Sequence, residues 1–182
     1  MSGGTGTLIG VVGLLGLAIQ GWGKDSLTIT STAFQASQEI PVKHTCQGDD
    51  LSPALSWSGM PTGTRSLALV VEDPDAPDPA KPQRVWDHWI LYNLPPTATG
   101  LSAGVSPDKL PPGTLSGVTS AGKKPYHGPC PPVGRHRYFF KLYALDLMLP
   151  DLKSPEKKKL LEATRGHALA QAELIGTYEK KP

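Results

Sequence analysis

Proline and glycine interrupt this chain so often that long helices are disfavoured over most of its length. The sequence contains 20 glycines and 19 prolines among 182 residues. Proline lacks a backbone N–H, and glycine loses more conformational freedom than other residues when it is ordered, so both favour turns over regular elements. Charged residues make up only 19% of the chain. The composition therefore predicts a mainly β fold of short strands joined by many turns.

Several runs rich in apolar, β-branched and aromatic residues are expected to form strands. The clearest are residues 66–72 and residues 137–145. The first run must stop at Pro74 and Pro77, because proline cannot donate a hydrogen bond to a sheet. Three further strands are expected at residues 27–31, 55–57 and 85–92.

The remaining sequence predicts a long loop and a short helical C-terminal region. Residues 95–132 are dominated by Gly, Pro, Ser and Thr and are too long for an ordinary connection, so we expect a site-forming loop. Ser154 and Pro155 are typical of a helix N-terminus. One or two short helices are expected to follow, through residues 168–174, with the basic run 157–159 on a solvated helix face.

The N-terminal segment is expected to be a hydrophobic leader over residues 1–24, followed by one domain over residues 25–182. Residues 7–19 are apolar apart from glycine and threonine, and their length suits a signal peptide or an anchor better than a full membrane span. No Lys or Arg precedes them. Export to a periplasmic or extracellular location is the favoured expectation, with a cytoplasmic protein as the alternative.

Charge and motifs exclude several function classes. The net charge is only +2, and no basic run alternates with aromatic residues, so nucleic-acid binding is not expected. The chain has no phosphate-binding Gly-Lys-Ser/Thr loop, no nucleophile elbow and no cofactor fingerprint. We therefore expect no cofactor and a protein that is not an enzyme. The two cysteines, Cys46 and Cys130, allow one disulfide or two separate thiols.

Four blocks of sequence resemble the signature of the phosphatidylethanolamine-binding protein family, in its prokaryotic Raf kinase inhibitor-like branch. They are Asp73-Pro74-Asp75-Ala76-Pro77, Trp86-Asp87-His88-Trp89, Gly128-Pro129-Cys130-Pro131-Pro132, and residues 134–140, Gly-Arg-His-Arg-Tyr-Phe-Phe. The resemblance covers about residues 27–179. It implies a large antiparallel sheet with a second, smaller sheet, and a small pocket that binds phosphate-type anions or a phospholipid headgroup.

Carried over position by position, the resemblance implies a ligand-binding pocket made of eight residues. These are Asp73, Asp75, Trp86, His88, Gly128, Pro129, His136 and Tyr138. We expect the histidines to supply positive charge, so that affinity rises as pH falls from about 8 to 6. Gly128 would let backbone N–H groups approach the anion, and Asp73 would accept a hydrogen bond from a protonated phosphate.

Three alternatives remain open beside non-enzymatic anion binding. Asp73, Asp75, His88 and His136 could hold a metal ion, because histidine and carboxylate are common ligands. Asp73 could serve as a general acid or base in a phosphoester hydrolase, with His136 stabilising the developing charge. The protein could instead inhibit a kinase or a serine protease through its surface loops, and the sequence leaves a homodimer open.

Overall fold

The computed structural model describes Met1 and residues 26–181. The expected leader lies outside the described residues, apart from Met1. Within the described part, no helix is long and apolar enough to cross a membrane.

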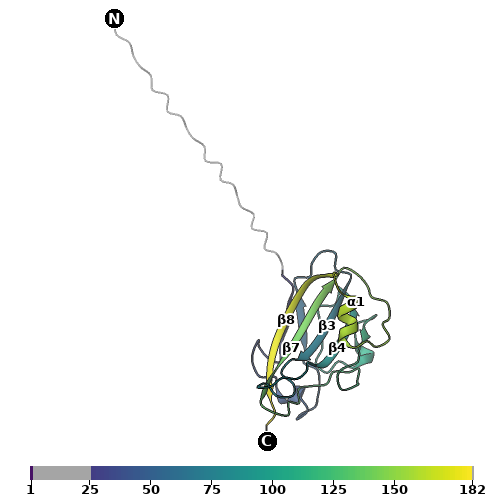
Figure 1. Ribbon diagram of the computed structural model, residues 1–182. Coiled ribbons are helices and arrows are strands. Elements are labelled where there is room, and N and C mark those ends of the chain that lie inside the picture. Colours follow the sequence, from purple (N-terminus) through teal and green to yellow (C-terminus); the bar gives the residue numbers. More distant parts are fainter. Residues whose placement is uncertain (2–25, 182) are drawn as a thin grey trace.

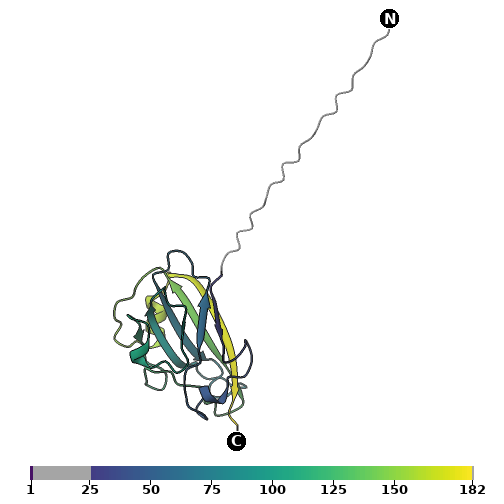
Figure 2. The same ribbon diagram turned by 180° about the vertical axis from the view of Figure 1, so that it is seen from behind.

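Two antiparallel sheets make up the fold, as the resemblance implied (Figure 1). The five-stranded sheet has the order β6-β4-β3-β7-β8, and the three-stranded sheet has the order β1-β2-β5. The three-stranded sheet lies behind the larger one in Figure 1 and comes to the front in Figure 2. The strands are β1 (Thr28–Ser31), β2 (Leu55–Ser58), β3 (Ser66–Asp73), β4 (Trp86–Leu94), β5 (Gly100–Leu101), β6 (Leu115–Ser116), β7 (Arg135–Leu145) and β8 (Ala168–Glu179).

The main hydrophobic core fills the space between the two sheets. Alternate residues of β7, including Tyr138, Phe140 and Leu142, are buried on this inner face. A smaller core lies on the outer face, where helix α1 (Lys157–Ala163) packs Leu160 against the sheet. Because β3 is buried on both faces, its sequence is a continuous apolar run instead of an alternating one.

The C-terminal region differs from the sequence-based expectation. One helix forms, α1, and it begins at Lys157 without a side-chain cap from the residues before it. Residues 168–174 are not helical but form the first half of strand β8, which pairs along β7. From Ala172 to Tyr178 every second residue is buried, which is the two-residue period of a strand with one face on the core. The helix-forming composition of this segment is overridden by pairing with β7 and burial.

The long proline-rich loop is not structureless. Residues 95–132 contain the short strands β5 and β6 and the 3₁₀ helix η2 (Pro107–Lys109), while a second 3₁₀ helix, η1 (Val42–His44), lies earlier in the chain. The last part of the loop runs back to the end of the sheet where β3 stops and β4 begins: the backbone N–H of His127 donates to the carbonyl of His88. This end of the sheet holds the candidate site.

Candidate functional site

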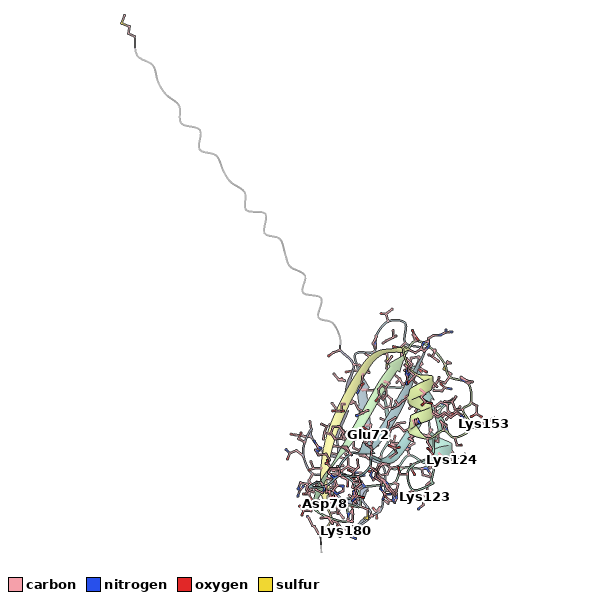
Figure 3. The ribbon with its side chains drawn as sticks, in the orientation of Figure 1. Glu72, Asp78, Lys123, Lys124, Lys153 and Lys180 are labelled. Carbon is pink, nitrogen blue, oxygen red and sulfur yellow. A yellow bond between two sulfur atoms is a disulfide. The ribbon has the colours of Figure 1, made fainter. Side chains whose placement is uncertain are left out.

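A cavity of about 200 Å³ opens at the end of the five-stranded sheet. Antiparallel pairing places Asp73, the last residue of β3, opposite Trp86, the first residue of β4. Ala76 and Pro77 line the cavity, and the next residue, Asp78, lies at the lower end of the molecule in Figure 3. The lining residues are Asp73, Ala76, Pro77, Arg84, Trp86, His88, His127, Cys130, Pro131, Pro132 and His136. Four of the eight expected residues are therefore on the cavity wall: Asp73, Trp86, His88 and His136.

Asp73 and His136 form a buried, hydrogen-bonded pair in this wall. His136 Nδ1 lies 2.7 Å from Asp73 Oδ2, and His136 Nε2 lies 3.0 Å from the carbonyl oxygen of Val133. The second Asp73 oxygen accepts the backbone N–H of Asp75 at 2.8 Å. Burial raises the pKa of Asp73, and the hydrogen bond from His136 opposes that rise. The pair therefore joins the end of β3 to the start of β7 by a hydrogen bond within the cavity wall.

His88 is buried with one ring nitrogen satisfied and the other free. Its Nδ1–H donates to the carbonyl oxygen of His127, while Nε2 has no hydrogen-bond partner among the described residues. Burial lowers the pKa of His88 to about 4, because a charged imidazole is poorly solvated there. The expectation that this histidine supplies positive charge between pH 8 and 6 is therefore wrong. At neutral pH the Nε2 of this lining residue is therefore a buried hydrogen-bond acceptor without a donor among the described residues.

Asp75 does not line the cavity but anchors a neighbouring strand. Its carboxylate accepts the backbone N–H and the Nε–H of Arg137, both at 2.9 Å, and the Nη2–H of the same residue at 2.7 Å. The hydrogen bonds from Arg137 lower the pKa of Asp75. We conclude that Asp75 fixes the start of β7 against the end of β3, which holds His136 in place beside Asp73.

Gly128 and Pro129 lie behind the cavity wall and not on it. The backbone N–H of Gly128 donates to Asp50 Oδ1 at 2.6 Å, so it is not available to an anion. A Cβ at this position would collide with the backbone carbonyl of His44, which explains the glycine. The carbonyl oxygen of Pro129 accepts the N–H of Cys46 at 3.1 Å. Both residues hold the loop in place, and the expectation that Gly128 contributes its backbone to the ligand is not met.

Tyr138 is also outside the lining set, although it packs directly against it. Its ring meets the ring of His88 edge-on, with centroids 5.2 Å apart, and its hydroxyl is buried without a partner among the described residues. Burial raises the pKa of this hydroxyl far above its ordinary value, so the group stays neutral. Its ring supports His88 from behind.

Arg84 is the most important lining residue that sequence reasoning missed. Its guanidinium lies 4.5 Å from the centre of the Trp86 ring. Among the described lining residues it is the one side chain with a permanent positive charge, and it makes no ion pair with another described residue. Arg84, Trp86 and His88 are spaced by two, and strand spacing places such residues on one face. That spacing was a signal for Arg84, whereas His127 lies in an irregular loop and carried no such signal.

A disulfide between Cys46 and Cys130 ties one wall of the cavity to the segment after η1. Cys130 itself lines the cavity, together with its neighbours Pro131 and Pro132. Of the two arrangements that the sequence allowed, the structure has the bonded one. As for the metal alternative, the described residues contain no group of three or more His, Cys, Asp or Glu side chains placed to hold a metal ion.

Comparison with known proteins identifies the family of this chain. Residues 30–179 match the family model described as phosphatidylethanolamine-binding protein. The chain belongs to this family. A relative is the UPF0098 protein of Methanothermobacter thermautotrophicus, which is 46% identical over 156 residues, 85% of this chain and 99% of that protein. The family and the prokaryotic branch expected from the sequence are confirmed.

Solved structures of the family confirm the fold. A phosphatidylethanolamine-binding protein homologue of Chlamydia trachomatis is 44% identical, with a TM-score of 0.79, and the match covers 86% of this chain and 99% of that one. Escherichia coli YbcL, described as a member of the mammalian family, is 32% identical with a TM-score of 0.77 and the same coverage. A carboxypeptidase Y inhibitor, solved with its cognate proteinase, is 20% identical with a TM-score of 0.55 over 85% of this chain and 83% of that one, which shows the fold alone.

Proposed function

We propose that this protein binds the phosphate group of a small molecule in the cavity at the end of the five-stranded sheet, without chemically changing it. The observation that carries the proposal is that Arg84, which forms no ion pair with another described residue, lies in the same cavity wall as the buried polar side chains of Asp73, His88 and His136. A cation at the wall and a few convergent polar groups inside a small hollow are the usual features of a site for a charged ligand.

The size of the cavity favours a headgroup over a whole lipid. Pockets that enclose a drug-sized ligand measure about 300 to 1,000 Å³, and this one measures about 200 Å³. A phosphate with a short substituent is in the right size range. The acyl chains of a phospholipid would have to remain outside.

Binding without catalysis is proposed because the described lining residues offer no free hydroxyl, thiol or amine nucleophile. Cys130 is held in a disulfide, and the set contains no Ser, Thr or Lys. Similarity to the carboxypeptidase Y inhibitor extends to the fold only, and we do not propose protease inhibition from it.

We also propose that the protein works in an oxidising compartment. The Cys46–Cys130 disulfide supports this, because disulfides persist mainly in secreted and periplasmic proteins. Trapping free thiols with an alkylating reagent in intact producing cells tests the proposal. Both cysteines should resist alkylation until a reductant is added, whereas immediate alkylation would point to a reducing compartment.

Calorimetric titration of the full chain with inorganic phosphate and phosphoethanolamine tests the binding proposal. We expect saturable binding that weakens about tenfold or more in Arg84→Gln, because charge-assisted hydrogen bonds contribute about 1.5–3 kcal/mol. Arg165→Gln is the matched control, since Arg165 is exposed and is not in the cavity wall. A folded protein that binds neither ligand, or equal losses in the two variants, would refute the proposal.

A further inference from the structure

One buried hydrogen-bond acceptor of a lining residue has no donor among the described residues. His88 Nδ1–H donates to the His127 carbonyl, which can only accept, so in the neutral ring Nε2 carries a lone pair and no proton. This nitrogen is buried in a side chain that is only 3% exposed, and it has no partner among the described residues. A buried acceptor without a donor costs free energy, which a ligand can recover by bringing a donor.

The Asp73–His136 pair does not supply a donor either. The Val133 carbonyl beside His136 Nε2 can only accept, so that nitrogen keeps its proton and directs it to the protein. The other proton lies between His136 Nδ1 and Asp73 Oδ2, 2.7 Å apart. Each polar hydrogen of the pair is thus directed to a protein oxygen or nitrogen, and the carboxylate keeps lone-pair capacity for a further donor.

The backbone of the cavity wall adds few donors. Pro77, Pro131 and Pro132 have no N–H, and the N–H of His127 is bonded to the carbonyl of His88. Arg84 donates from the exposed side, beside Trp86. The cavity wall therefore combines one cation, Arg84, with two side chains that can accept a hydrogen bond, Asp73 and His88.

Building on the proposed function, we infer that the cavity selects a phosphomonoester in its singly protonated, monoanionic form, whose P–OH donates to His88 Nε2 or to Asp73. An unprotonated phosphate oxygen in the same place would face these lone pairs and be repelled. A phosphodiester carries the same single charge but has no P–OH. The cavity thus discriminates against phosphodiesters, which include the headgroup linkage of phospholipids, and against sulfate.

Two isomeric ligands of equal charge and similar size isolate the effect of the P–OH proton on affinity. Ethyl phosphate is a monoester and dimethyl phosphate a diester with the same atoms, and at pH 5.5 each is mainly a monoanion, since the second pKa of a phosphomonoester is about 6. Titration of the full chain at pH 5.5 should give an affinity for ethyl phosphate at least about tenfold above that for dimethyl phosphate. Raising the pH to 8 should weaken binding of ethyl phosphate more than binding of dimethyl phosphate, because only the monoester loses a P–OH proton over this range.

Two variants test whether His88, and not Arg84, causes the preference for the monoester. Arg84→Gln should weaken both isomers by a similar factor and preserve their ratio, because it removes the positive charge of Arg84. His88→Phe should bring the ratio toward one, because it removes the acceptor. If His88→Phe does not fold, the comparison of the isomers on the unaltered protein still decides the matter.

The outcomes distinguish this inference from the proposed function. Equal affinities for the two isomers, or tighter binding of dimethyl phosphate or sulfate, would overturn the inference and leave phosphate-group binding standing. If none of the four ligands binds, neither the two isomers nor inorganic phosphate nor phosphoethanolamine, the proposed function is overturned and this inference with it.

Discussion

Two aspartates two positions apart have different tasks at the end of β3. Asp73 faces the cavity with His136, whereas Asp75 turns to Arg137. In Asp75→Asn an amide N–H₂ replaces one oxygen that accepts from Arg137, so two donors face each other. We expect unfolding free energy at neutral pH to fall by about 1–2 kcal/mol, discounted because Arg137 is partly solvated. Phosphate affinity should change little.

The pH dependence of this effect has a definite sign. Because Arg137 lowers the pKa of Asp75 in the folded protein, the stabilisation is present above the ordinary carboxyl range and is lost as pH falls through the lowered value. Urea titrations at pH 7 and near pH 2 should therefore show a difference that shrinks in acid. Asp78→Asn is the control, since among the described residues the Asp78 carboxylate bonds only the nearby N–H of Ala80. A deficit for Asp75→Asn that persists undiminished in acid would contradict this role.

At the residue scale, motif positions could be predicted better than their roles. Asp73, Trp86, His88 and His136 were located because each stands in a recognisable block. The role of Asp75 depends on Arg137, which comes beside it only through the antiparallel pairing of β3 and β7. The depressed pKa of His88 follows from burial, which a sequence motif does not report. Contacts between distant segments decide these points, and sequence spacing carries little information about them.

At the scale of elements, helix α1 is fixed to the sheet by charge as well as by Leu160. Lys157 Nζ lies 2.8 Å from Glu72 Oε2 and 2.7 Å from Asp87 Oδ1, and Glu72 also bonds Lys141. Figure 3 shows Glu72 on the face of the sheet. The contact between Lys157 and Asp87 is a short ion pair, and its alignment is too poor for a hydrogen bond. The expectation that residues 157–159 form a fully solvated face is wrong for Lys157, which is 17% exposed.

Removal of this lysine should be costly. Lys157→Ala leaves Asp87 without its cation and Glu72 with one cation instead of two, and we expect a loss of about 3 kcal/mol in unfolding free energy at pH 7. Burial raises the pKa of Asp87 and Lys157 opposes that rise, so the variant should recover part of its deficit in mild acid as Asp87 becomes protonated. Denaturant titrations at pH 7 and pH 5 measure both effects.

Lys158→Ala is the matched control for this helix. Lys158 is exposed and forms no ion pair with another described residue, so its loss should change stability by about 0.5 kcal/mol or less. Similar losses for the two lysines would show that helix propensity or net charge, and not the ion pairs, explains the effect.

The strands and helices differ in how well sequence anticipates them. Residues 66–72 and 137–145 were correctly expected as strands because both are long, apolar and bounded by turn residues. Residues 168–174 were expected as helix because they follow the helix start at Ser154 and Pro155, but they pair with β7 as a strand, although Ala, Leu, Gln and Glu favour helices. The burial of Ala172, Leu174 and Tyr178 explains the outcome. The alternation of buried and exposed residues from Ala172 to Tyr178 arises because pairing with β7 turns one face of the strand toward the core.

At the scale of the whole molecule, the cavity is assembled from segments far apart in the chain. Residues of β3, β4, the loop around Cys130 and β7 form its wall, and the loop has little strand pairing to hold it. Its ties include the Cys46–Cys130 disulfide, the bond from Gly128 N–H to Asp50 and the bond from the Tyr126 hydroxyl to the His44 carbonyl. The disulfide is the one covalent tie in this group.

Loss of the disulfide should therefore lower both stability and ligand affinity. The bond spans 84 residues, and closure of a loop of this size restricts the unfolded chain by about 4 kcal/mol in the chain-entropy account. We expect the Cys46→Ser, Cys130→Ser double variant to lose about 2–4 kcal/mol of unfolding free energy. Its affinity for ethyl phosphate should also fall, because Cys130 is part of the cavity wall.

Reduction of the unaltered protein separates the bond from the side chains. If the covalent tie is responsible, a reductant should reproduce both losses in the unaltered protein and have no effect on the double variant. A variant that loses stability but binds ethyl phosphate with unchanged affinity would show that noncovalent contacts alone hold the wall, and that the disulfide acts only on the unfolded chain. Thermal melts and titrations with and without reductant distinguish these cases, because the first reports on the whole fold and the second on the cavity.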